Sequence, residues 1–427
     1  MHDTQAALAE RALLVGLERN GQDKWAVRDS LGELRELAES AGAVVLETLI
    51  QKRDVPSAPT FIGSGKAAEL AALCRTTAAN MVIFDDDLSP AQGRNLGEII
   101  GPTVKVLDRT ELILDIFAQR ARTREGKIQV ELAQMQYMLP RLTGLWTHLS
   151  RQRGGVGCRG PGETQLEVDR RRVQEKITRL QRELGEVRKN RRVERSGRQR
   201  LHWPVVSLVG YTNSGKSTLM NALTGANVLA EDKLFATLDP TTRKLRLPNN
   251  QNILLTDTVG FLRKLPHHLV ESFQATLEEV AEADLLLHVV DASHPQAAEQ
   301  IKAVEVVLQE IGAWGKPTVV ALNKMDLLTG DAPVRARFQR EFPQAVPIAA
   351  KSGENLDGLL DEMVTRLREW RVEVALRIPQ DRAKTIALVY QSGHVHTRSH
   401  ENGDVLLRAQ IPKVLAGELA PFIVPAP

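Results

Sequence analysis

The chain has 427 residues, of which 42% are hydrophobic and 26% are charged, and it contains only two cysteines. This composition indicates a globular protein of about two to four domains, and the cysteine count argues against a disulfide framework. No apolar run approaches the length of a membrane-spanning helix, and the N-terminus lacks a signal-peptide pattern. We therefore expect a cytoplasmic protein, with a peripheral membrane-associated fraction left open.

The first part of the chain alternates short apolar runs with helical patterns. Strands are expected at residues 12–17, 43–50, 81–85 and 104–108, and helices at 30–42 and 65–77. This alternation predicts a small N-terminal α/β domain, residues 1–110, with a largely parallel sheet. The stretch GSGK at 63–66 lacks the spacing of a phosphate loop and is interpreted as the entry to a helix. A second nucleotide, such as ATP, bound by this domain is the alternative.

Two helical stripes joined by a Gly- and Arg-rich connection follow. Apolar residues recur at steps of three and four, at Ile128, Leu132, Met135, Leu139 and Leu142, and at Val173, Ile177, Leu180, Leu184 and Val187. They predict an antiparallel helical hairpin over residues 111–202, with RQRGGVGCRGPGE at 151–163 at or near its tip.

Basic residues are concentrated in this hairpin. Residues 141–202 contain 17 Lys and Arg against 7 Asp and Glu, a net charge of +10, whereas the rest of the chain has a net charge of −7. A basic segment on an acidic protein indicates a polyanionic partner, although a charge run alone also fits a solvated helix face. Arginines suit phosphates and glycines allow close backbone approach, so folded RNA is the expected partner. The residues expected to contact it are Arg151, Arg153, Arg159, Arg170, Arg171 and Arg172.

Alternating strands and helices return from residue 203 to about residue 370. Strands are expected at 203–210, 253–257, 284–290, 318–324 and 346–350. A small C-terminal α+β domain, residues 371–427, is expected to contain two or three strands within 386–412, with turns at 392–393 and 402–403. The predicted fold class is thus α/β, with the N-terminal domain and hairpin followed by a P-loop domain at 203–370 and this C-terminal domain.

The stretch GYTNSGKST, residues 210–218, matches the pattern GxxxxGK[ST] between a strand and a helix. Backbone N–H groups of such a loop point at phosphate oxygens, and the helix N-terminus adds partial positive charge. Lys216 is expected to reach the β- and γ-phosphates, and Ser217 to bind Mg²⁺. The expected nucleotide contacts in this loop are Gly210, Asn213, Ser214, Gly215, Lys216, Ser217 and Thr218.

Three further motifs follow the ends of later strands. Asp257 of DTVG can hold Mg²⁺ through water, and Gly260 can approach the γ-phosphate through its N–H. Asp326 of NKMD can accept from both N1–H and the 2-amino group of guanine, a donor pair that adenine lacks. Because ligands of open α/β sheets bind at this strand edge, we predict a site for GTP or GDP with Mg²⁺. Its base-side residues are expected to be Asn323, Lys324, Asp326, Ala349, Ala350 and Lys351.

Motifs in both halves of the chain resemble the HflX family of translation-factor-class GTPases. They are LFATLDPTTRKL, DTVGFLRKLPHHLVESFQATLEE, DRTELILDIFAQRARTREGKIQVELAQMQY and GGVGCRGPGETQLEVDRRR. The resemblance implies a GTPase that binds the large ribosomal subunit and its RNA and splits or rescues stalled or idle ribosomes under stress. It also implies that Thr237 coordinates Mg²⁺ and acts in catalysis with Lys216 and Gly260. The nucleotide-contacting residues of this switch segment are then Phe235, Ala236, Thr237, Leu238 and Asp239.

Phe261 occupies the place where many GTPases carry a water-orienting glutamine. We expect slow hydrolysis by the isolated protein, either because a partner completes the site or because Phe261 packs beneath the switch while backbone groups position the water. Asn213 matches the asparagine that holds K⁺ in some GTPases with such a hydrophobic replacement, and the alternative is that it only shapes the loop.

Two functional classes remain open from the sequence. The first is a GTPase, expected as a monomer, that remodels the ribosome. The second is a nucleotide-gated switch that binds a protein or membrane partner and uses hydrolysis as a timer.

Overall fold

The computed structural model describes residues 10–20, 24–142, 165–199, 203–225, 234–235, 237–264, 274–328, 330, 332–401 and 403–425. The chain forms two compact units. The first unit comprises Met1–Glu186, Lys233–Phe235 and Lys264–Ser272, and the second comprises Val187–Asp232, Ala236–Arg263 and Phe273–Pro427. None of the described helices combines the length and the apolarity that crossing a bilayer requires.

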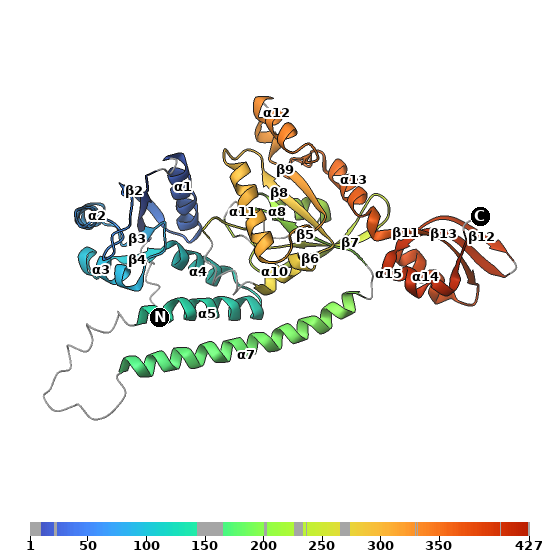
Figure 1. The fold of residues 1–427 in the computed structure, drawn as a ribbon, viewed down its shortest axis with the longest axis horizontal. Coiled ribbons are helices and arrows are strands. Elements are labelled where there is room, and N and C mark those ends of the chain that lie inside the picture. Colours follow the sequence, from blue (N-terminus) through green and yellow to red (C-terminus); the bar gives the residue numbers. More distant parts are fainter. Residues whose placement is uncertain are drawn as a thin grey trace, which may run out of the picture. The chain divides into compact units, whose positions relative to one another are not determined.

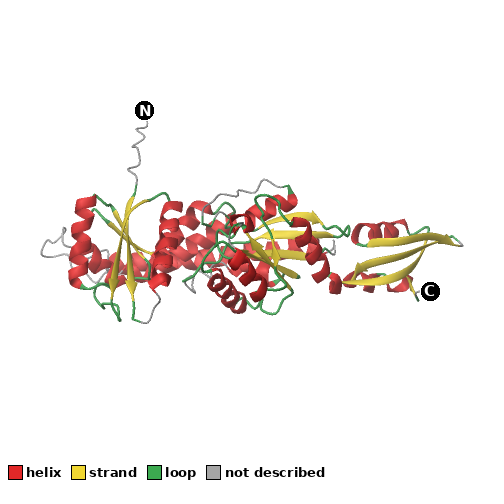
Figure 2. Cartoon of the chain, turned by 90° about the horizontal axis from the view of Figure 1, so that it is seen from above, coloured by secondary structure: helices red, strands yellow, loops and turns green. Residues whose placement is uncertain are grey.

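The first unit is built on a parallel four-stranded sheet in the order β2-β1-β3-β4. Helices lie on both of its faces (Figures 1 and 2). Strands and helices were predicted at all of these positions except α3, which begins with a capping box formed by Ser89 and Gln92. The elements are β1 (Arg11–Glu18), α1 (Lys24–Ser40), β2 (Val44–Lys52), α2 (Ser64–Thr77), β3 (Met81–Phe84), α3 (Pro90–Ile100) and β4 (Lys105–Asp108).

The predicted helical hairpin is present in the first unit. The helical stretch after residue 110 is divided into α4 (Arg109–Arg120) and α5 (Arg124–Met138), because Thr123 caps a new helix by accepting from the N–H of Gly126. A short η1 (Leu139–Arg141) follows. The part of α7 (Gln165–Gln199) that belongs to this unit runs antiparallel to α5 (Figure 1), and Lys176 pairs with Glu131 at 2.6 Å. The stripe residues buried in it are Ile128, Leu132, Leu142, Ile177, Leu180 and Leu184.

The second unit contains a six-stranded sheet in the order β10-β9-β8-β5-β7-β6. All neighbours are parallel except β6, a polar edge strand that pairs antiparallel with β7 and was not predicted. Its strands are β5 (Val205–Val209), β6 (Thr241–Arg246), β7 (Asn252–Asp257), β8 (Leu285–Asp291), β9 (Thr318–Asn323) and β10 (Val346–Pro347). The helices packed around it are α8 (Lys216–Thr224), α10 (Gln274–Ala281), α11 (Ala297–Glu310), α12 (Ala332–Glu341) and α13 (Leu356–Arg366), with short η3 (Met325–Leu328) and η4 (Arg368–Trp370).

A second, antiparallel sheet of this unit has the order β12-β13-β11-β14. One prediction for this domain was wrong: residues 386–391, expected in a strand, lie in helix α14 (Ala383–Ser392). This helix packs against β12 and β13. An apolar run this short fits a strand or a buried helix turn equally well. The expected turn at 392–393 is thus a helix end, and that at 402–403 lies partly outside the described residues. The other elements are β11 (Arg371–Pro379), β12 (His394–Glu401), β13 (Asp404–Pro412), α15 (Lys413–Glu418), η5 (Ala420–Phe422) and β14 (Ile423–Val424).

A titratable carboxyl group lies in a pocket of about 810 Å³ between α3, α4 and α5. Burial, with smaller contributions from Asp108 and Asp115, raises the pKa of Glu111 to about 7, against the opposing effect of Arg141. Because the folded state then holds this proton more tightly than the unfolded chain, its contribution to stability is present at low pH and is lost as pH rises towards 7.

We therefore expect Glu111→Gln to stabilise the protein at pH 8 by about 1–2 kcal/mol, allowing for partial solvent screening, and to leave stability at pH 4.5 nearly unchanged. Denaturant unfolding of both proteins at the two pH values measures this difference. Glu98→Gln, an exposed residue of the same pocket, is the matched control. An equal effect of Glu111→Gln at both pH values would contradict the assignment.

Candidate functional site

The loop from β5 to α8 has the geometry predicted for a phosphate-binding loop. Gly210 and Gly215 have φ values of +150° and +94°, and a Cβ at Gly210 would lie 2.2 Å from the carbonyl oxygen of Val289. Glycine is therefore required at both positions. The buried Lys216 Nζ donates to the carbonyl oxygens of Gly210 at 3.1 Å and Tyr211 at 2.7 Å, so its ammonium lies directly over the loop.

Three oxygen-bearing side chains meet at the start of α8. Ser217 Oγ lies 2.7 Å from Asp257 Oδ2 and 2.9 Å from Thr237 Oγ1, and Thr237 Oγ1 lies 2.9 Å from Asp257 Oδ2. The structure thus brings together the three residues predicted to hold Mg²⁺. Two hydroxyls and a carboxylate form the hard-oxygen set that Mg²⁺ prefers, and the buried Asp257 Oδ1 has no hydrogen-bond partner among the described residues. These residues fit a magnesium ion.

The buried charges of this cluster depend on one another. Burial lowers the pKa of Lys216 to about 8, while Asp257 opposes this effect. Burial raises the pKa of Asp257, and Lys216, Ser217 and Thr237 oppose that effect. Both ions are therefore stabilised by their neighbours, and added phosphate or metal charges would act on them directly.

The base side of the site is organised around Asn323 at the end of β9. Its Nδ2 donates to Ser214 O at 2.9 Å, and its Oδ1 accepts from the N–H of Ala350 at 2.9 Å. Lys324 pairs at 2.7 Å with Asp291, a residue at the end of β8 that the sequence interpretation missed. Asp326 lies in η3, which starts at the same strand edge.

The backbone N–H groups of Ala349 and Ala350, two of the predicted base-side residues, have partners within the protein. The N–H of Ala349 donates to Glu354 O at 3.2 Å and that of Ala350 donates to Asn323, so both are already used within the protein. The loop after β10 is closed by the hydrogen bond between Ala349 and Glu354. The sequence motif at the end of the strand does not predict this bond. Contacts of Ala349, Ala350 and Lys351 with a guanine base stay a prediction.

Phe261 holds the DTVG segment against the phosphate-binding loop through its backbone. Its N–H donates to Gly210 O at 3.1 Å and its carbonyl accepts from Thr212 N–H at 2.7 Å, while only 4% of the residue is exposed. A Cβ at Gly260 would lie 2.7 Å from Thr212 Cα and 3.1 Å from Lys216 Nζ, so glycine permits this close approach.

The residues of the switch segment, 235–239, belong to both units. Thr237 joins the oxygen cluster, and Leu238 and Asp239 follow it in the second unit. Phe235 groups with the first unit, where its ring packs on that of Phe117 with centroids 4.7 Å apart, so its side chain is not part of the cluster. Ala236 lies outside the described residues.

The remaining predicted residues are distributed as follows. Asn213 has a left-handed backbone with φ +58° in the loop, Ser214 is buried in it, and Thr218 lies in the first turn of α8. Of the six arginines, Arg170, Arg171 and Arg172 are exposed on α7, whereas Arg151, Arg153 and Arg159 lie outside the described residues.

Four family models match consecutive parts of the chain. They are described as GTP-binding GTPase N-terminal (residues 28–118), GTP-binding GTPase Middle Region (120–198), 50S ribosome-binding GTPase (205–324) and HflX C-terminal domain (336–421). The N-terminal match includes β2, β3 and β4 of the four-stranded sheet, and the middle match includes α5 and nearly all of α7.

Curated relatives extend the similarity over nearly the whole chain. A "GTPase HflX" of Caldanaerobacter subterraneus is 45% identical over 97% of this chain and 94% of its own, and that of Escherichia coli is 45% identical over 95% and 94%. A solved GTP-binding protein from Sulfolobus solfataricus in complex with GDP aligns at 26% identity over 84% of this chain and 99% of its own, with a TM-score of 0.44. On the identity and coverage of its curated relatives, the chain belongs to the HflX family of GTPases.

Proposed function

We propose that this GTPase binds GTP and GDP together with Mg²⁺ at the edge of the six-stranded sheet, and that it hydrolyses GTP slowly until a partner is bound. The observation that carries the proposal is the convergence of Ser217, Thr237 and Asp257 within 2.9 Å of one another beside Lys216. A bound Mg²⁺ would neutralise charge that develops on the phosphate oxygens.

The protein's own groups would position and stabilise the reacting phosphate. Lys216 has its ammonium over the loop and within reach of phosphate oxygens placed there. Thr237 links the switch segment to the metal ligands, so its position depends on the ligand bound. The backbone of Gly260 lies close to Lys216, and its N–H would donate to the same phosphate.

Slow hydrolysis by the isolated protein is supported by the surroundings of Phe261. The side chain at this position is buried, and its backbone N–H and carbonyl are both used to hold the phosphate-binding loop. No group of residue 261 is therefore free to orient water. The orienting or charge-stabilising group must come from another residue, a cation or a partner.

The proposed partner is the large ribosomal subunit, which the protein would bind through the basic hairpin in order to split or rescue stalled or idle ribosomes under stress. Support comes from the exposure of three consecutive arginines on α7 and from the match of residues 205–324 to a family described as 50S ribosome-binding GTPase. Arginines on a helix surface suit RNA phosphates.

Base selection by Asp326 gives the first prediction for this function. Asp326→Asn should weaken GDP binding by about 100-fold or more, because the amide cannot accept from both guanine donors. The same variant should gain affinity for xanthosine diphosphate, whose C2 carbonyl can accept from the new amide. Displacement of a fluorescent nucleotide measures both affinities, with Asp361→Asn, an exposed residue of α13, as the control. Unchanged GDP binding would remove Asp326 from the base site.

A potassium requirement is the second prediction. Turnover of GTP should be faster in KCl than in NaCl at equal ionic strength, because a monovalent cation between phosphates can stabilise charge where an arginine otherwise would. Asn213→Gly should abolish the difference, and glycine tolerates the left-handed backbone of this position. Equal rates of the native protein in both salts would leave Asn213 with a role in loop shape only.

The hairpin gives the third prediction. Large subunits or intact ribosomes should stimulate GTP turnover, and Arg170→Glu combined with Arg172→Glu should reduce this stimulation by about 10-fold or more, with a steep dependence on salt. Arg337→Glu combined with Arg340→Glu changes the net charge equally on the exposed face of α12 and should retain it. Stimulation by a ribosome-free protein extract, without any by ribosomes, would favour a protein partner instead.

A further inference from the structure

A small pocket of about 320 Å³ lies in the second unit, where the turn between β6 and β7 meets the start of β11 and of β12. Its lining is basic and amide-rich, and no Asp or Glu of the described residues contributes to it. The polar side chains that the argument uses are Gln251, Arg368, Arg371, His394, His396 and Gln410.

Arg371, the first residue of β11, is the central group of this pocket. Only 7% of it is exposed, and the one hydrogen bond that its side chain makes within the described residues runs from Nη2 to the carbonyl oxygen of Ser392 at 3.5 Å. Its Nε and Nη1 are buried and have no acceptor among the described residues. Burial lowers the pKa of Arg371 to about 10, so the guanidinium is still charged at neutral pH.

A buried arginine elsewhere in the chain shows how such a charge is normally compensated. Arg109 in the first unit is 2% exposed and is ion-paired with both Asp85 and Glu33. A buried charge without an opposite charge is costly, because water no longer solvates it. Within the part of the chain that the structure describes, Arg371 has no carboxylate partner of this kind.

Other donors face the same pocket. Gln251 is 1% exposed, and its Nε2 is buried without an acceptor among the described residues. The rings of His394 and His396 lie edge to face with centroids 4.8 Å apart. Burial lowers the pKa of His394, and His396 and Arg371 add to this effect. All of these groups would be satisfied by one anion rich in acceptor oxygens.

We propose that this pocket binds a phosphate group, held by the guanidinium of Arg371 and the side-chain amide of Gln251 beside His394 and His396. A guanidinium matches the oxygens of a phosphate with two parallel N–H donors. The pocket is separate from the GTP site, because Gln251 precedes β7 and Asp257 ends it, which places the two at opposite ends of a strand about 20 Å long.

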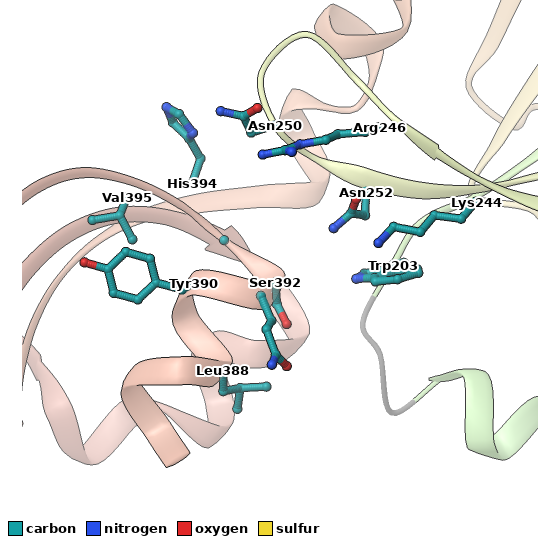
Figure 3. Close-up of a pocket in the computed structure, with 12 residues that line it drawn as sticks. Trp203, Lys244, Arg246, Asn250, Asn252, Leu388, Tyr390, Ser392, His394 and Val395 are labelled. Atoms are coloured by element: carbon teal, nitrogen blue, oxygen red, sulfur yellow. The ribbon is translucent and has the colours of Figure 1, made fainter. Parts of the chain in front are cut away.

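A larger pocket of about 660 Å³ shares His394 with this one, and its lining is drawn in Figure 3. Lys244 lies over the ring of Trp203 at 4.6 Å from its centroid, and Arg246 and Asn252 lie on the same side (Figure 3). Positive charge beside an aromatic ring suits the remainder of a nucleotide chain. The phosphate can thus be a free anion or part of an RNA backbone.

The test compares the native protein with Arg371→Met, with the GTP site filled by Mg²⁺ and a non-hydrolysable GTP analogue. Inorganic phosphate should raise the melting temperature of the native protein but not that of Arg371→Met. Without phosphate the variant should melt at least as high as the native protein, because it lacks the uncompensated charge. Arg377→Met is the matched control, since Arg377 lies on the same strand but is ion-paired with Asp404 at 2.8 Å; it should keep the phosphate response.

A short single-stranded RNA, followed by fluorescence anisotropy, separates the two sources of phosphate. A response to inorganic phosphate identifies a free anion, whereas RNA binding that Arg371→Met weakens by about 10-fold, without a response to inorganic phosphate, identifies a backbone phosphate. Gln251→Met should lower the affinity for the same ligand several-fold. This variant replaces Arg371→Met in the test if Arg371→Met does not fold cooperatively. The proposal is overturned if neither ligand distinguishes these variants from the native protein and from Arg377→Met.

Discussion

One buried amide holds the nucleotide site in shape. Asn323 is 3% exposed, and its two polar atoms join the phosphate-binding loop at Ser214 to the loop after β10 at Ala350. Gly215 is required beneath it, because a Cβ there would lie 2.2 Å from Nδ2. An aspartate at 323 would present an acceptor to the carbonyl of Ser214 and would break this link. The phosphate and base ends of the site are therefore positioned by a single side chain.

The parts of the structure that follow local rules could be predicted from the sequence. The phosphate-binding loop is predictable from its glycines, which adopt backbone angles that other residues rarely adopt. Buried parallel strands are predictable from unbroken apolar runs. The meeting of Ser217 and Asp257 follows from the parallel order of β5 and β7. The position of Thr237 at the same point was predicted only from the family resemblance, because its segment has no periodic pattern of its own.

The features that could not be predicted depend on contacts between distant residues. β6 is polar and becomes a strand only because β7 offers it an edge, and α14 is a helix because it packs on a sheet formed by residues on both sides of it. The pocket around Arg371 is assembled from segments near residues 251, 371, 394 and 410. Each of these segments has the pattern of an ordinary turn or strand. Only their proximity in space shows that no described Asp or Glu lies beside the arginine.

Phe261 is held in the predicted nucleotide site by its backbone. A water-orienting residue must place a polar group next to the γ-phosphate, but the ring of Phe261 is buried and its backbone is bonded to Gly210 and Thr212. The backbone at this position therefore joins the DTVG segment to the loop between β5 and α8. Because these hydrogen bonds use backbone atoms, they require no polar side chain at this position. A group that orients water would have to come from outside residue 261.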